Sequence, residues 1–205
     1  LFTTLTGPTI TTKFILIYKG YTMIHFSINK NFFLHALTVT KRAISHKNAI
    51  PILSTVKIEV TRDAIILTGS NGQISIENTI PASNENAGLL VTNPGSILLE
   101  AGFFINIISS LPDVTLEFTE IEQHQIVLTS GKSEITLKGK DVDQYPRLQE
   151  MPTDTPLTLE TKLLKSIINE TAFAASQQES RPILTGVHLV ISQNKYFKAV
   201  ATDSD

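Results

Sequence analysis

The sequence predicts an α+β fold in which short helices pack on antiparallel strands, arranged in two related domains. Alternating apolar residues mark many short strands, whereas only three stretches have the spacing of an amphipathic helix. A pattern of strand, helix, loop and strand also occurs twice along the 205 residues. Hydrophobic residues make up 41% of the chain and charged residues 18%, which is typical of a globular protein and excludes a disordered one.

The first half of the first domain reads as a strand, a helix and three strands. Apolar residues alternate over residues 24–28, which predicts a strand, and helical spacing follows over residues 33–40. Three strands are then expected over residues 53–60, 64–69 and 74–80.

The second half of the first domain repeats this order. A strand is expected over residues 89–91 and a helix over residues 94–110, with Asn93 as its N-cap and Pro94 at the first helical position. Three more strands are expected over residues 114–118, 125–129 and 133–138. The domain therefore consists of two βαβββ units, with two helices packed on antiparallel sheets.

A longer repeat relates this domain to the end of the chain. Pro51 aligns with Pro182, an offset of 131 residues (182 − 51), and "IPIL" aligns with "RPIL". Apolar positions coincide at this offset in the strand, the helix and the strand after the loop. The pairs include Ile28 with Leu159, Phe33 with Leu164, Leu37 with Ile168, Ile58 with Leu189, and Val60 with Ile191. Agreement of several elements in one register favours a true repeat over two unrelated segments of similar periodicity.

The repeat suggests the domain boundaries. The chain does not begin with Met, and Met23 precedes the first alternating strand, so residues 1–22 are expected to be an extension outside the fold. Residues 23–148 form the first domain, and residues 149–155, rich in proline and acid, form a linker. Residues 156–205 form a second domain that is expected to be incomplete, because the repeat stops within it.

Composition excludes several kinds of site. The chain has no cysteine, which rules out disulfides and thiolate metal sites and suits the cytoplasm. Its five histidines show no metal-ligand spacing, so neither a metal nor a cofactor is expected. A formal net charge of -2 argues against coating nucleic acid through bulk positive charge. No apolar run is long enough to cross a bilayer.

These features together resemble the bacterial sliding clamp family, the β subunit of DNA polymerase III. The resemblance rests on the duplicated βαβββ unit, on "IPIL" and "RPIL" after the first helix of each domain, and on the closing "ATDS". "NPGSILLEAGFFINIISSLPD" and "TSGKSEITLKGKDVDQYP" stand where the family has its second helix, last strands and linker. The resemblance covers residues 23–205 and implies the DNA clamp fold.

The resemblance implies a processivity factor with no catalytic residues. Family members have three such domains per chain, and two chains close head to tail into a ring around double-stranded DNA. The third domain is expected to be absent from this sequence, which stops within the second.

Two helix faces are candidate DNA-binding surfaces. Asn31, His35, Thr38 and Arg42 fall on one polar face of the first helix, with Lys41 beside them. The third helix carries Lys162 and Lys165 in the same manner. Spacing alone favours ordinary solvated faces, but the resemblance implies that both line the hole of the ring, where cations contact phosphates without reading bases.

The loops after these helices contain more specific candidates for contact with DNA. Lys47 and Gln178 are equivalent in the repeat, and the resemblance implies that both contact DNA, with His46 beside them. The alternative is that all three are exposed turn residues.

Two protein-binding sites are also implied by the resemblance. Leu184 and Thr202 match part of a pocket for peptides from the DNA polymerase III alpha or PolC-type polymerase, the clamp loader and repair polymerases. Leu184 is equally compatible with an ordinary core position, and Asp205 stands where the family usually has histidine, which puts peptide binding in doubt. Near the end of the first domain, an edge strand of the homodimer interface is expected to contain Lys132, Glu134 and Ile135.

Two other classes of function are compatible with the sequence. One is a protein-interaction scaffold without a nucleic-acid role, which has no need for a stripe of cations and amides. The other is a metal-dependent nuclease, since paired carboxylates can hold Mg²⁺. The candidate pairs are Asp141 with Asp143, Glu120 with Glu122, and Asp203 with Asp205. A spacing of two is common in turns, however, and nothing brings the pairs together.

Overall fold

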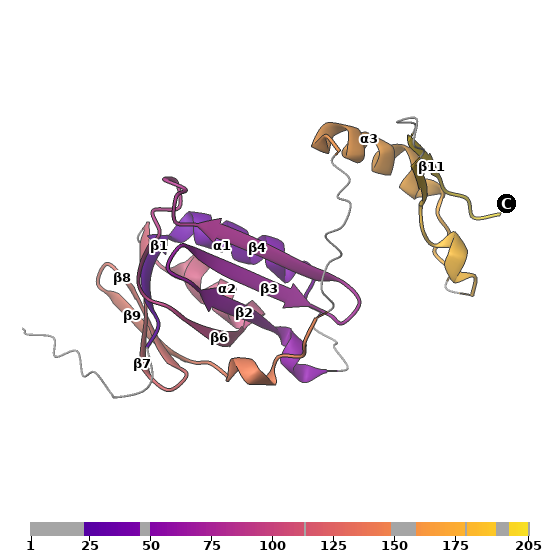
Figure 1. Ribbon diagram of the computed structural model, residues 1–205. Helices are drawn as coiled ribbons and strands as arrows, with labels where there is room; N and C mark the ends of the chain where they lie inside the picture. Colours follow the sequence, from indigo (N-terminus) through magenta and orange to yellow (C-terminus); the bar gives the residue numbers. More distant parts are fainter. Residues whose placement is uncertain are drawn as a thin grey trace, which may run out of the picture. The chain divides into compact units, whose positions relative to one another are not determined.

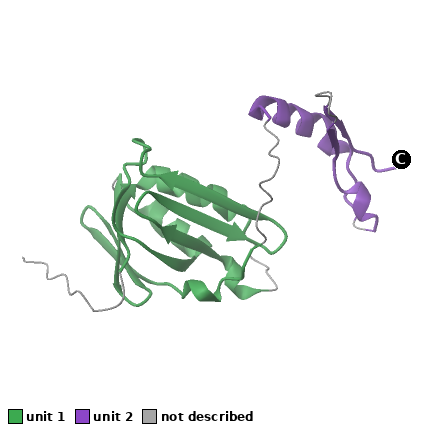
Figure 2. Cartoon of the chain, viewed as in Figure 1, with its two compact units in different colours: residues 1–149 green, residues 150–205 purple. Residues whose placement is uncertain are grey.

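The computed structural model describes residues 23–45, 50–112, 114–148, 159–178, 180–191 and 197–204. The chain divides into two compact units, unit 1 (Leu1–Gln149) and unit 2 (Glu150–Asp205), which are described separately (Figure 2). In the described parts, no helix is long and apolar enough to cross a membrane.

Unit 1 contains two α-helices and nine strands among its described residues (Figure 1). The elements are β1 (His25–Asn29), α1 (Lys30–Lys41), the 3-10 helix η1 (Pro51–Ser54), β2 (Thr55–Val60), β3 (Ala64–Ser70), β4 (Ser75–Pro81), β5 (Leu90–Asn93), β6 (Gly95–Glu100), α2 (Ala101–Ser110), β7 (Thr115–Glu122), β8 (Gln125–Ser130), β9 (Ser133–Lys138) and the 3-10 helix η2 (Val142–Gln144).

The strands form two antiparallel sheets, in the orders β5-β1-β7-β8-β9 and β4-β3-β2-β6. The strand before each helix pairs with the strand after the other helix: β1 pairs with β7, and β6 pairs with β2. Unit 1 therefore consists of two βαβββ halves related by an approximate two-fold axis, β1 to β4 with α1, and β6 to β9 with α2. The predicted duplication is confirmed, but its second half begins with β6 and not with the strand predicted over residues 89–91, which corresponds to β5, an additional edge strand.

The predicted helix over residues 94–110 is wrong in its first part. Residues 95–100 form β6, and α2 begins at Ala101, capped by Glu100 instead of Asn93. Ile97 and Leu99 lie in the core, and Leu98 is also buried, where its backbone pairs with Lys140. A strand buried on both faces has no alternation, so its periodicity is indistinguishable from that of a buried helix.

The core of unit 1 centres on four phenylalanines, one from each of the central strands and helices. Phe26 of β1 stacks on Phe118 of β7 at 4.7 Å between ring centroids. Phe33 of α1 meets Phe104 of α2 edge to face at 6.1 Å. Phe33 and Phe104 each stand four residues after the N-cap of their helix, so they are related by the approximate two-fold axis.

The described residues of unit 2 repeat part of the first half of unit 1, from the helix to the first strand pair. Its elements are α3 (Thr161–Thr171), the 3-10 helices η3 (Ala172–Ala174) and η4 (Pro182–Leu184), and the antiparallel pair β10 (His188–Ile191) and β11 (Phe197–Val200). The hydrogen bonds repeat as well. Thr40 donates to the Ala36 carbonyl in α1, and Thr171 donates to the Ile167 carbonyl in α3.

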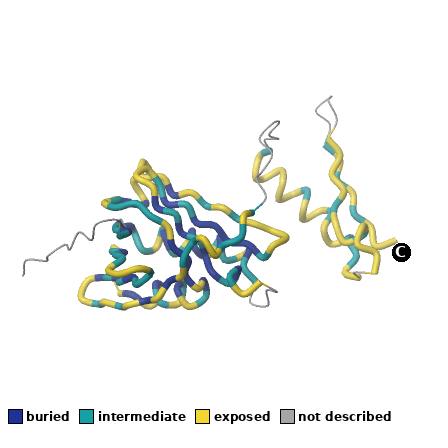
Figure 3. Tube along the Cα trace, turned by 60° about the horizontal axis from the view of Figure 1, so that its bottom comes forward, coloured by how far each residue is buried: buried dark blue, intermediate teal, exposed yellow. Residues whose placement is uncertain are grey.

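Burial distinguishes the two units (Figure 3). Unit 1 contains a continuous buried cluster contributed by both sheets and both helices. Among its described residues, unit 2 has no buried residue.

Candidate nucleic-acid interface

The polar face of α1 comprises Asn31, His35, Thr38 and Arg42, and all four are exposed, as the spacing predicts. Asn29 starts the helix, because its side-chain oxygen accepts a hydrogen bond from the Phe32 N–H at 3.1 Å. The opposite face buries Phe33, Ala36, Leu37 and Thr40. Since α1 contains no acidic residue, its polar face has cationic, imidazole, amide and hydroxyl groups only.

Two further lysines of α1 differ in their surroundings. Lys41, in the last turn, is half-buried beside the polar face. Lys30 donates a hydrogen bond of 2.6 Å from Nζ to the Leu111 carbonyl, at the C-cap of α2. Lys30 therefore ties the two helices together, and this role is not visible in the sequence because the acceptor is a distant backbone group.

The polar face of α3 is exposed in the same way. It presents Lys162, Lys165 and Asn169 to solvent. Ser166 donates a hydrogen bond to Glu170, so this face carries a carboxylate as well as two cations. Its electrostatic attraction for phosphate is accordingly weaker than that of a face with cations alone.

The predicted loop contacts are only partly described. His46 and Lys47 lie outside the described residues. Gln178 is exposed, and its backbone N–H donates to Ser176 Oγ at 3.1 Å. Contact of these residues with DNA stays a prediction.

The predicted peptide-pocket residues lie in neighbouring segments of unit 2. Leu184 is half-buried, and its carbonyl accepts a hydrogen bond from the Ser176 N–H at 2.8 Å. Thr202 is exposed, and its hydroxyl accepts from the Ser204 N–H at 3.1 Å. Arg181 joins the two segments by donating to Ser204 Oγ at 3.0 Å. The sequence does not reveal this role of Arg181, because its acceptor lies 23 residues further along the chain.

The predicted interface strand does lie at a sheet edge. Within the described residues, β9 pairs with β8 alone and is the last strand of the five-stranded sheet. Lys132 and Glu134 are exposed, whereas Ile135 is half-buried against the core. The outer backbone groups of such an edge can accept another strand. Their use in a dimer stays a prediction.

Two of the paired carboxylates, Glu120 and Asp141, accept hydrogen bonds from backbone N–H groups, and Asp205 lies outside the described residues. Glu120 accepts hydrogen bonds from the Ile24 N–H at 3.2 Å and the His124 N–H at 2.9 Å. Asp141 accepts from the Asp143 N–H at 3.0 Å, which caps η2. The described residues contain no group of three or more His, Cys, Asp or Glu placed to hold a metal. The structure offers no support for a nuclease.

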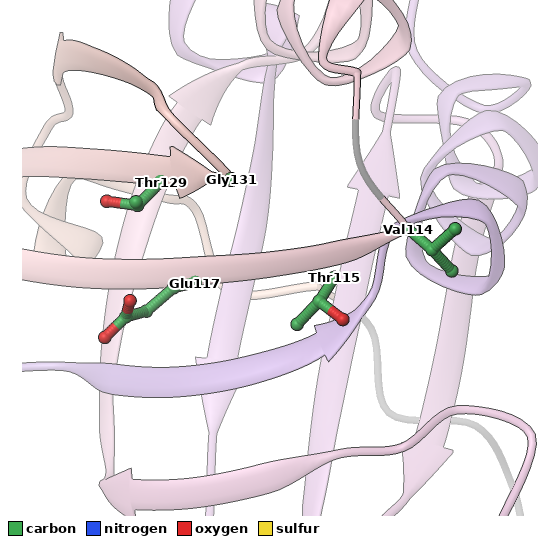
Figure 4. Close-up of a pocket in the computed structure, with 5 residues that line it drawn as sticks. All are labelled: Val114, Thr115, Glu117, Thr129 and Gly131. Carbon is green, nitrogen blue, oxygen red and sulfur yellow. The ribbon is translucent and has the colours of Figure 1, made fainter.

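A pocket of about 500 Å³ lies on the five-stranded sheet, lined by Val114, Thr115, Glu117, Thr129 and Gly131 (Figure 4). Glu117 is its single carboxylate, and Oε1 lies 3.2 Å from His25 Nε2.

Comparison with known proteins agrees with this architecture. Residues 24–149 match the family model described as DNA polymerase III beta subunit, N-terminal domain, and residues 158–205 match its central domain. The chain belongs to the DNA polymerase III beta subunit family.

Individual members of the beta subunit family are very similar to this chain in sequence and structure. The beta sliding clamp of Streptococcus pneumoniae (strain R6) is 77% identical over 89% of this chain and 48% of its own length, and that of Lactococcus lactis is 58% identical over the same shares. A crystal structure of the S. pneumoniae TIGR4 beta chain has a TM-score of 0.85 at 77% identity, covering 88% of this chain and 48% of that one. The Bacillus subtilis sliding clamp has a TM-score of 0.83 at 37% identity, covering 89% of this chain and 48% of that one. This family member thus has the predicted clamp fold and spans about half the length of its curated relatives.

Among the described residues of this beta subunit chain, Tyr145 has a strongly perturbed pKa. Burial raises the pKa of Tyr145 to about 12, and the Ser70 backbone opposes part of the rise. Its hydroxyl is neutral at physiological pH, as that of an unperturbed tyrosine would be. Tyr145 lies just after η2, away from the polar face of α1 in sequence, and the proposed DNA contacts do not use it.

Proposed function

We propose that this chain functions in a sliding clamp, a non-catalytic ring that encircles duplex DNA and holds the replicative polymerase on it. The observation that carries the proposal is the polar face of α1, which is exposed and free of acidic residues. Membership of the beta subunit family supports the same function.

Electrostatics explains how a slightly acidic chain can hold DNA. Its formal charge of -2 excludes a bulk effect, so the attraction must come from local cations. Lysine and arginine bind phosphates of any sequence, and a ring needs few such contacts because closure itself prevents dissociation. The residues proposed to contact DNA are Lys41, Arg42, His46, Lys47, Lys162, Lys165 and Gln178.

The proposed assembly is a head-to-tail homodimer. The edge of β9, with Lys132, Glu134 and Ile135, would extend the five-stranded sheet into the partner chain. Leu184 and Thr202 would contribute to a pocket for peptides of the DNA polymerase III alpha or PolC-type polymerase, the clamp loader and repair polymerases. The proposed location is the cytoplasm.

A topological experiment tests the function directly. A protein of the full length of the relatives, containing this sequence, is placed by a clamp loader on a nicked circular duplex, and retention is measured before and after one cut linearises the DNA. We expect stable retention on the circle and release after the cut, because a sliding ring leaves through free ends. Equal retention on circle and line would indicate ordinary surface binding and contradict the proposal.

A further inference from the structure

The turn between β3 and β4 contains a chemically reactive dipeptide, Asn71–Gly72. An asparagine before glycine is prone to lose its side-chain amide, because a glycine has no side chain to keep its backbone nitrogen away from the preceding Cγ. Among the asparagines of the chain, only Asn71 is followed by glycine. The sequence therefore favours this reaction at Asn71 over any other position.

The reaction at this dipeptide needs only water as a co-reactant. The backbone nitrogen of Gly72 forms a bond to Cγ of Asn71, the Cγ–Nδ2 bond breaks, and the proton of the Gly72 nitrogen leaves with Nδ2 as ammonia. Water then opens the resulting succinimide at one of its two carbonyl groups. The product is aspartate, or isoaspartate, in which the main chain runs through the side-chain carbon.

The structure holds the attacking nitrogen in place. The Gly72 N–H donates a hydrogen bond to Ser70 Oγ at 3.0 Å, and Ser70 is fully buried. The Ser70 hydroxyl is itself fixed, because it donates to the Ile74 carbonyl at 3.1 Å and accepts from Ser75 Oγ at 3.0 Å. Water does not reach this buried acceptor, so the Gly72 nitrogen is released only when the turn opens.

The side chain of Asn71 is held as well. Its Oδ1 accepts hydrogen bonds from the N–H groups of Gln73 at 3.0 Å and Ile74 at 2.9 Å, which closes a local turn. Gly72 completes the turn with φ of +89°, a left-handed value that glycine adopts without strain. Because the two bonds to Oδ1 fix the plane of the amide, the group cannot turn freely toward the attacking nitrogen.

We propose that Asn71 is a latent deamidation site, and that the Ser70 hydroxyl controls the rate of its conversion by keeping the turn closed. The reaction then proceeds from the fraction of molecules in which the turn is open, so its rate follows the local opening equilibrium. The proposal concerns the turn between β3 and β4 alone and does not depend on DNA binding.

The first test is the rate of deamidation of the 205-residue chain, incubated at mildly alkaline pH and followed by mass spectrometry of its peptides. In the chain unfolded by urea, Asn71 should convert before any other asparagine. In the native chain, its conversion should be at least about tenfold slower, because the turn must open first. This comparison needs no variant, so it applies even if a substitution in the turn prevents folding.

A pair of variants tests the role of Ser70. Ser70→Ala should raise the native rate at Asn71 by about fivefold, since the Gly72 N–H loses its acceptor. Thr61→Ala is the matched control, because Thr61 Oγ1 accepts backbone hydrogen bonds in the turn between β2 and β3. This change should leave the rate at Asn71 unaltered.

Hydrogen exchange of the Gly72 amide tests the mechanism independently. Exchange and deamidation both require the open turn, so Ser70→Ala should accelerate the two reactions by the same factor. Equal rates of deamidation in the native and the unfolded chain would overturn the proposal. So would a native rate that Ser70→Ala leaves unchanged, or one that Thr61→Ala raises as much as Ser70→Ala does.

Discussion

Adjacent residues of α2 have opposite surroundings. Phe103 is 60% exposed, whereas Phe104 is 1% exposed and contacts Phe33 and Phe118. The difference follows from helix geometry, since a step of one residue turns the side chain by about 100° around the axis. The same residue type is thus a core residue at one position and a surface residue at the next.

These two phenylalanines provide a matched stability experiment. Phe104→Ala should lower the free energy of unfolding by about 3–5 kcal/mol, because it leaves a cavity among packed rings. Phe103→Ala should change it by less than about 1 kcal/mol. Urea unfolding followed by circular dichroism measures both. Equal losses would show that α2 does not pack as described.

At the scale of elements, α1 and α3 have the same arrangement of apolar and polar faces, but different residues surround them. Each has an apolar face and an opposite polar face, and Thr40 and Thr171 make the same hydrogen bond at the same position. The apolar face is buried only in α1, because only there do the second helix and the sheets cover it. The polar faces, by contrast, are exposed in both helices.

The polar face of α1 predicts a measurable salt dependence. In the full-length protein, Lys41→Ala combined with Arg42→Ala should reduce the slope of log Kobs against log salt concentration by about 2 for duplex DNA, since each lost phosphate contact contributes about 0.9. Arg62→Ala is the control, because Arg62 is an exposed cation in the turn between β2 and β3. An equal change in slope for Arg62→Ala would show that the effect reflects net charge and not the α1 face.

At the scale of the whole molecule, the two units differ in what stabilises them. Unit 1 closes its core between two sheets and two helices, so its hydrogen-bonded backbone is protected by burial. The described residues of unit 2 form a helix and a hairpin without a buried residue. A two-stranded hairpin with one uncovered face is marginally stable in water.

Hydrogen exchange of the 205-residue chain should reveal this difference. Amides of α3 should exchange at least about a hundredfold faster than those of α1. The buried amides of unit 1 exchange only when the whole unit unfolds, so their protection reflects nearly the full free energy of unfolding. Equal protection of α1 and α3 would contradict this view of the molecule.

Much of the architecture could be predicted from pattern alone. Residues 33–40 have helical spacing, and the structure places a helix there with its polar face exposed. The match of Phe33 with Leu164 and of Ile58 with Leu189 predicted the repeat of α1 and β2 as α3 and β10. These features are predictable because helix and strand periodicity, caps and turns depend on residues close together in the chain.

Other features required the folded molecule. Only pairing with β2 and Lys140 distinguishes β6 from the start of a helix, since Ile97, Leu98 and Leu99 are all buried. Similarly, only folding brings Lys30 to the Leu111 carbonyl and Glu120 to the Ile24 N–H. These groups lie far apart in sequence, and their contacts depend on how strands pair and faces are buried. Local pattern therefore specifies which faces are apolar, while long-range packing decides what covers them.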